Sequence, residues 1–81
     1  MTARVFVSLK PTVLDPQGQT IRKALNAHGH PEVSDVRQGK YFDVALTGPL
    51  TEEQALTVVE TIARDILANP VIENYKIELV D

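Results

Sequence analysis

The stretch Leu9-Lys10-Pro11-Thr12-Val13-Leu14-Asp15-Pro16-Gln17-Gly18 decides how the N-terminal part of this chain folds. It joins an alternating segment to a helical pattern. Asp15 is a preferred N-cap residue, and proline suits the first helical position because its missing N–H would have no partner there. We therefore expect a helix from Pro16 to His28, followed by Gly29 at the C-terminal cap position.

Alternation of apolar and polar residues predicts the strands, because side chains in a strand point to opposite faces in turn. The first strand places Phe6 on its otherwise polar face. Gly39 and Lys40 are interpreted as the tight turn of a hairpin between the second and third strands. The predicted strands are residues 2–10, 33–38, 41–47 and 71–80.

A second helix is predicted after Thr51-Glu52-Glu53-Gln54, which has the pattern of a capping box. An apolar stripe continues through residues 55–67, and Pro70 disfavours the helical conformation at Asn69. The resulting order, β-α-β-β-α-β, predicts an α+β fold of the ferredoxin-like sandwich type. We expect a four-stranded antiparallel sheet with both helices on one face and an open second face.

Composition places the chain among small single-domain proteins, and residues 1–81 are interpreted as one domain. A net charge of −3, with two Tyr and two Phe, argues against nucleic-acid binding. No apolar run suggests a membrane span, and the first residues lack the pattern of a signal peptide, so we expect a cytoplasmic protein. Because the chain has no cysteine, no disulfide stabilises it, and self-association is expected.

No arrangement of residues predicts catalysis, a metal site or a bound cofactor. The histidines of His28-Gly29-His30 are interpreted as surface residues, because no set of further ligands accompanies them. The basic segment Arg37-Gln38-Gly39-Lys40 fits either an anion contact or a solvated turn. Phe6 fits either an isolated surface aromatic or a contact with another subunit.

Three motifs together resemble the PurS family: residues 9–18, the segment Val36-Arg37-Gln38-Gly39-Lys40, and Leu67-Ala68-Asn69-Pro70-Val71-Ile72-Glu73-Asn74-Tyr75. PurS is the small subunit of phosphoribosylformylglycinamidine (FGAM) synthase. The resemblance implies a non-catalytic subunit in purine biosynthesis that bridges the PurL synthetase and the PurQ glutaminase as a dimer and supports ammonia transfer. ATP and Mg would be used by PurL and not by this chain. The alternative is a self-associating, ligand-sensing domain of the ACT type.

The resemblance and the open sheet face also indicate which residues contact other subunits, whether PurL, PurQ or a second copy in a dimer or tetramer. They lie in the first loop, the basic segment and the segment before the last strand, together with the aromatic residue of the open face. The candidate interface residues are Phe6, Lys10, Pro11, Leu14, Asp15, Pro16, Arg37, Gly39, Lys40, Asn69, Pro70 and Tyr75.

Overall fold

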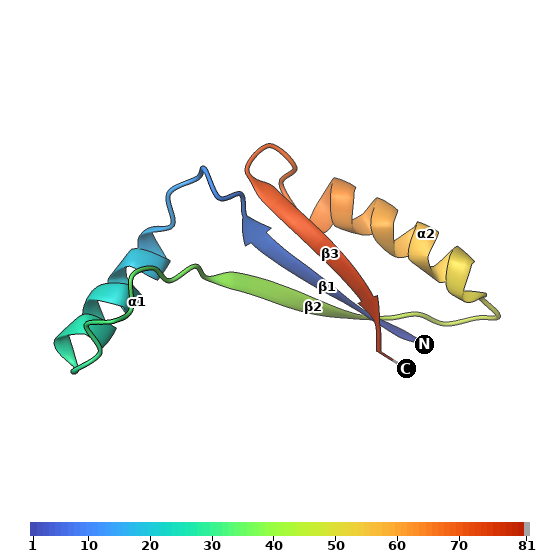
Figure 1. Cartoon of the computed structure of the whole chain (residues 1–81). Helices are drawn as coiled ribbons and strands as arrows, with labels where there is room; N and C mark the ends of the chain where they lie inside the picture. Colours follow the sequence, from blue (N-terminus) through green and yellow to red (C-terminus); the bar gives the residue numbers. More distant parts are fainter. Residues whose placement is uncertain (81) are drawn as a thin grey trace.

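The computed structural model describes residues 1–80, which form a three-stranded sheet, two α-helices and a short π-helical segment (Figure 1). This is an α+β fold, as predicted, but with one strand fewer. The elements in chain order are β1 Thr2–Leu9, α1 Pro16–Ala27, β2 Gly39–Ala45, α2 Glu52–Ile62, η1 Ala63–Leu67 and β3 Glu73–Leu79.

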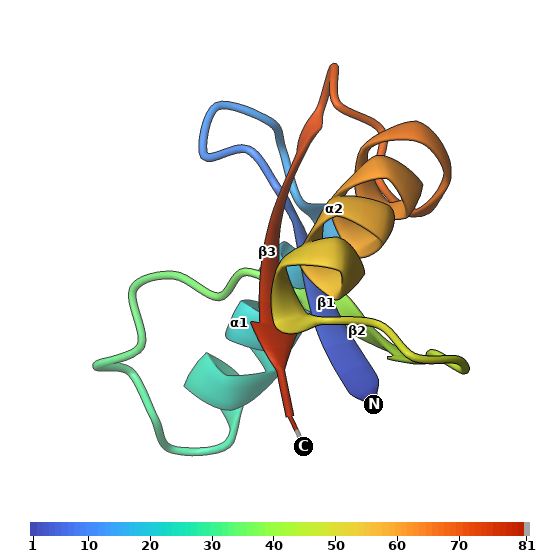
Figure 2. The same cartoon turned by 90° about the vertical axis from the view of Figure 1, so that its right-hand side faces the viewer.

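The sheet has the order β2-β1-β3, and β1 pairs antiparallel with both neighbours. Val5 lies opposite Phe42 on one side and Ile77 on the other, so the apolar residues of all three strands share one face. Helix α2 covers this face, as Figure 2 shows. The buried core of the sheet and this helix comprises Ala3, Val5, Val7, Val59, Ala63 and Ala68.

The start of α2 confirms the predicted capping box. The Thr51 hydroxyl accepts a hydrogen bond from the Gln54 backbone N–H at 3.1 Å, and the Gln54 side chain accepts one from the Thr51 N–H at 3.0 Å. Two of the N–H groups at the helix end are thereby satisfied. The helix stops before Pro70, as predicted, after its last turn widens into η1. None of the helices within residues 1–80 is long and apolar enough to cross a membrane.

The predicted hairpin at Gly39-Lys40 is wrong. Both residues lie in β2, where Gly39 pairs with Ser8 and Lys40 pairs with Val7. Residues 33–38 form no strand. They run back beside α1, where the Val36 carbonyl lies against Gly18. The Asn26 side chain on that helix donates to the backbone carbonyls of His30 and Val33, which holds the returning segment against the helix. The fourth strand is therefore replaced by irregular chain.

The prediction that both helices cover one sheet face is also wrong. Helix α1 lies beyond the end of the sheet, so the molecule is elongated, with extents of 51 × 27 × 14 Å (Figure 1). Its radius of gyration is 16.2 Å, whereas a compact domain of this length would have about 12 Å. The physical reason is that α1 packs against its own returning segment, which brings no fourth strand to the sheet beneath it.

Replacing Thr51 with alanine tests the contribution of the capping box. Thr51→Ala should lower the free energy of unfolding by about 1 kcal/mol, because an N–H group at the helix end loses its acceptor. A thermal melt should show a lower midpoint than the wild type. Thr61→Ala, which removes an exposed hydroxyl bonded only within α2, is the control and should melt close to the wild type. Equal melting of both variants and the wild type would contradict this account.

Candidate functional site

Three segments that are distant in sequence meet at one end of the sheet. They are residues 10–15, residues 37–40 and residues 69–73, and we call them together the loop junction. The Lys10 N–H donates to the Ile72 carbonyl at 2.9 Å and joins the first segment to the third. The three motifs that resemble one family in the sequence are thus neighbours in space.

Asp15 links the first segment to the second. Its carboxylate accepts from the Gln38 N–H at 2.7 Å and from the Gly18 N–H at 2.9 Å. The side chain is buried, at 4% exposure. These two hydrogen bonds, of which the one from Gln38 has the larger effect, lower the pKa of Asp15, although desolvation opposes them. Asp15 therefore caps α1, as predicted, and also ties that helix to the start of β2.

Arg37 binds the loop that follows β1 through its side chain. Its guanidinium donates to the Lys10 carbonyl at 2.9 Å and to the Val13 carbonyl at 2.8 Å. Within the loop, the Val13 N–H donates to the Lys10 carbonyl and closes a turn. Gly39 and Lys40 therefore lie in a strand and not in a turn. The Arg37 guanidinium is exposed, but it is already bound to two backbone carbonyls.

The third segment is ordered by its own hydrogen bonds. The Asn69 N–H donates to the Glu73 carboxylate at 2.7 Å, and the Asn69 side-chain oxygen accepts from the Val71 N–H at 3.1 Å. The Glu73 N–H in turn donates to the Asn69 carbonyl. Asn69 and Glu73 thus hold the turn around Pro70 in one conformation before β3 begins.

Two glycines allow the close backbone approaches on which the junction depends. A Cβ atom at Gly18 would lie 2.0 Å from the Val36 carbonyl oxygen, which is far inside contact distance. At Gly39 a Cβ atom would lie 2.9 Å from the Val7 carbonyl oxygen. Both contacts are with backbone atoms, so the neighbour cannot rotate away. A larger residue at Gly18 would push α1 off the segment that leads into β2.

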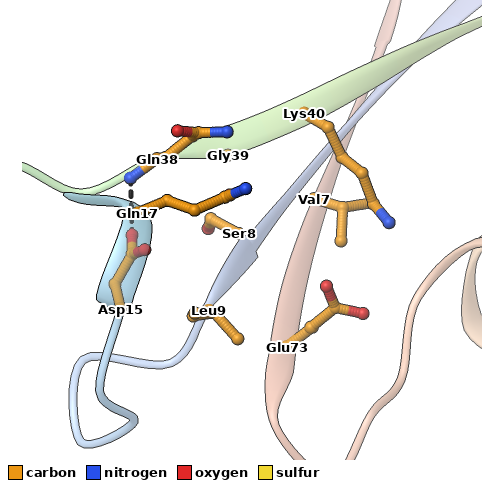
Figure 3. A pocket seen from close by; sticks show the side chains of 9 residues that line it. All are labelled: Val7, Ser8, Leu9, Asp15, Gln17, Gln38, Gly39, Lys40 and Glu73. Atoms are coloured by element: carbon orange, nitrogen blue, oxygen red, sulfur yellow. Dashed lines mark hydrogen bonds between the residues drawn. The ribbon is translucent and has the colours of Figure 1, made fainter. Parts of the chain in front are cut away.

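A partly open cavity of about 220 Å³ lies inside the junction. Figure 3 shows that its lining comes from all three strands and from the start of α1. Charged and amide side chains surround it, and the Lys40 amine also lies 5.6 Å from the centre of the Phe42 ring. The lining residues are Val7, Ser8, Leu9, Asp15, Gln17, Gln38, Gly39, Lys40 and Glu73.

The structure brings most of the candidate interface residues together and leaves two apart. The junction and the adjoining first turn of α1 contain Lys10, Pro11, Leu14, Asp15, Pro16, Arg37, Gly39, Lys40, Asn69 and Pro70. Phe6 lies on the open sheet face, where its ring is 6.1 Å from that of Tyr41. Tyr75 packs against the core on the opposite face. An interface role for all twelve candidate residues, including these two, stays a prediction.

Sequence reasoning missed several residues that build the junction. Gln38 supplies the N–H that Asp15 binds, and Glu73 caps the turn at Asn69. Val71 is the most exposed large apolar residue described, at 77%. No local pattern identifies the first two, because their partners are set by the tertiary fold. The exposure of Val71 could have been predicted from the sequence, because an apolar residue at a turn directly after Asn69-Pro70 lies outside the core.

Among residues 1–80 no group of three or more His, Asp or Glu side chains is placed to hold a metal ion. The ion pair between Arg4 and Asp43, at 2.8 Å, lies on the open sheet face beside Tyr41, where it lowers the pKa of Asp43. The polar groups of the junction, by contrast, are engaged mainly with backbone atoms. These hydrogen bonds hold the loops of the junction in one conformation and so fix the shape of the surface that the loops form.

Asp15→Asn tests the link between α1 and β2 through its pH dependence. The pKa of Asp15 is lower in the folded chain than in the unfolded chain. Its stabilisation is therefore complete above the unfolded pKa of about 4 and is lost as the pH falls through the folded pKa. Asp15→Asn should be less stable than the wild type at pH 7, and the difference should shrink towards pH 2.

Urea denaturation at several pH values measures this difference. Asp35→Asn, on the exposed returning segment, is the matched control and should differ little from the wild type at any pH. Parallel stability curves for Asp15→Asn and the wild type would show that the charge of Asp15 does not hold the junction.

Comparison with known proteins adds to this geometry. The profile of the PurS family, described as phosphoribosylformylglycinamidine (FGAM) synthase, matches residues 2–81. The PurS subunit of Synechocystis is 42% identical over 94% of this chain and 75% of its own length. The PurS subunit of Bacillus subtilis is also 42% identical, over 94% of this chain and 88% of its own length.

Solved structures agree with the sequence relatives. A crystal structure of PurS from B. subtilis superposes with a TM-score of 0.83 at 38% identity and covers 99% of this chain and 98% of that one. A chain in a structure of PurLQS from Thermotoga maritima gives a TM-score of 0.84 at 27% identity, over 95% of this chain and 93% of its own. The resemblance predicted from the three motifs is confirmed: this chain belongs to the PurS family and is a subunit of FGAM synthase.

Proposed function

We propose that this chain is the non-catalytic subunit that joins the PurL synthetase and the PurQ glutaminase in one complex. The observation that supports it most is the loop junction, where the three family motifs form one ordered surface. The PurLQS structure from T. maritima contains a chain of the same fold. In this role the chain acts in the cytoplasm and supports the passage of ammonia from PurQ to PurL, which uses ATP and Mg to convert formylglycinamide ribonucleotide (FGAR) to FGAM.

The hydrogen bonds of the junction support a docking role rather than a catalytic one. Asp15 is the one buried charged side chain among residues 1–80, and both of its oxygens are bound to backbone N–H groups. Arg37 is bound to two carbonyls. The Asp15 carboxylate and the Arg37 guanidinium therefore order the chain around them and are not free to act on a substrate. Preordered loops also lower the entropy cost of binding another subunit.

Exposed apolar residues on the junction are suited to contact the larger subunits. Leu14 is 70% exposed and Val71 is 77% exposed. Each projects from a loop that hydrogen bonds hold in place. Apolar side chains on rigid loops are typical anchors of protein interfaces, because their burial stabilises the complex without ordering more chain.

We also propose that the chain self-associates as a dimer or tetramer. The open sheet face carries Phe6 and Tyr41, at 37% and 58% exposure, and we assign this face to another subunit of the assembly. The ACT-type alternative is not favoured, since the relatives described above are PurS subunits.

Omission of the chain tests the bridging role. With cognate PurL and PurQ, glutamine-dependent FGAM formation should require this chain, because ammonia released by an unattached PurQ escapes to solvent. Turnover with free ammonium should proceed without it. The measurement is FGAM formation with either nitrogen source, with and without the chain. Equal glutamine-dependent turnover in its absence would exclude bridging.

Leu14→Glu tests the junction as the docking surface. An acidic group in place of an apolar anchor should raise the concentration of this chain that gives half-maximal glutamine-dependent activity by about tenfold or more. The circular dichroism melt should stay close to the wild type, because Leu14 is exposed.

Val80→Glu is the matched control for this variant. Val80 is 42% exposed and lies after β3, where its N–H pairs with Thr2 at the end of the sheet away from the junction. It should leave the activity titration unchanged. An unchanged titration for Leu14→Glu would show that the junction does not bind the larger subunits.

A further inference from the structure

The cavity of the loop junction has a size and a lining that suit a small ligand. Its volume of about 220 Å³ is that of about seven water molecules at ~30 Å³ each. Sites for drug-sized ligands are larger, at roughly 300–1,000 Å³. The cavity therefore suits a molecule of a few non-hydrogen atoms rather than a nucleotide.

Lys40 supplies a positive charge whose donors are free. Its amine lies over the Phe42 ring, 5.6 Å from the ring centre. Among residues 1–80 it has no hydrogen-bond acceptor and no ion-pair partner. A lysine ammonium has three N–H donors, so a carboxylate that entered the cavity would find a cation ready to bind it.

Glu73 supplies a negative charge on the other side of the cavity. One of its carboxylate oxygens accepts from the Asn69 N–H at 2.7 Å, and the second has no donor within the described part of the chain. In Figure 3 the side chains of Glu73 and Lys40 extend toward one another, yet no ion pair joins them. A ligand that carries both charges would satisfy both side chains at once.

The third charge of the lining is already balanced. The Asp15 carboxylate is bound to the N–H groups of Gln38 and Gly18, and the nearby Arg37 guanidinium has the opposite charge. A simple anion would therefore meet the negative Glu73, and a simple cation would meet the positive Lys40. A small molecule with one charge of each sign is matched best.

The space between the two charges has an apolar floor. Val7 and Leu9 line it, and both belong to β1, which lies between β2 and β3. An aliphatic group of a ligand could pack on them. The Gln17 side chain also extends into this space from the start of α1, where its amide offers a further donor and acceptor (Figure 3).

We propose that this cavity binds a free α-amino acid with an aliphatic side chain, in its zwitterionic form. The ligand's carboxylate binds Lys40, its ammonium group binds Glu73, and its side chain packs on Val7 and Leu9. A ligand held in this way joins β2 to the segment before β3. The site lies within one chain, so this inference rests neither on self-association nor on the binding of PurL or PurQ.

Titration of the full chain with L-leucine, followed by the amide signals in NMR spectra, tests the site. We expect saturable shifts at the residues that line the cavity, with a dissociation constant on the order of 1 mM, because a partly open site leaves the ligand partly hydrated. Isocaproate lacks the ammonium group of leucine, and isoamylamine lacks its carboxylate. Each of these analogues should bind about tenfold more weakly or worse.

Two substitutions assign the two charges. Lys40→Met should remove the advantage of L-leucine over isoamylamine, because the carboxylate loses its partner. Glu73→Gln should remove its advantage over isocaproate, while the new amide oxygen can still accept from the Asn69 N–H. Lys76→Met and Glu78→Gln, on the opposite sheet face, are the matched controls and should bind L-leucine like the wild type.

The comparison of the three ligands on the wild-type chain decides the question even where a variant fails to fold. Equal affinity for L-leucine and both analogues would overturn the proposal, since the cavity would then recognise only the aliphatic part. No saturable shift up to about 50 mM, far above the expected dissociation constant, would also overturn it. So would shifts confined to residues outside the cavity. The bridging role is tested separately, by glutamine-dependent FGAM formation.

Discussion

The hydrogen bonds from the Gln38 and Gly18 N–H groups to the Asp15 carboxylate are the constraint on which the rest of the structure depends. They fix the start of α1, the start of β2 and the end of the loop after β1 at one point. Arg37 then binds the carbonyls of that loop, and the Lys10 N–H reaches the segment before β3. Three connections that would otherwise move independently are thereby ordered without a hydrophobic core of their own.

This arrangement explains how a small chain without disulfides can hold an open shape. Its buried core lies between the sheet and the α2–η1 helix, around Val5 and Val59. Helix α1 receives its orientation from the hydrogen bonds at its N-terminal end and not from packing on the sheet. A direction set by backbone contacts to a buried carboxylate is specific in geometry, and only the returning segment packs against the side of the helix.

Local signals in the sequence predicted the parts of the fold that depend on neighbouring residues. Asp15-Pro16 and the Thr51 capping box each define a helix start within a few residues, and both were confirmed. The hairpin was not predictable in the same way. Val33 and Val36 are three residues apart, which is not the spacing of a strand, and Gly39 is required by the nearby Val7 carbonyl rather than by a turn.

In the candidate site, too, local features were predictable from the sequence and tertiary contacts were not. The sequence identified the three segments, but not that they meet, because Arg37 bonds to carbonyls 24 and 27 residues away. Such contacts are determined only when the sheet brings the loops to one end.

The position of the junction relative to the sheet separates two tasks that a bridging subunit must perform. The loops at one end present Leu14 and Val71, while Phe6 and Tyr41 lie on the open sheet face. If one surface served both, self-association would compete with the binding of the larger subunits. Because the Asp15 carboxylate joins the loop after β1 to the start of β2, its hydrogen bonds hold that loop in place at the end of the sheet.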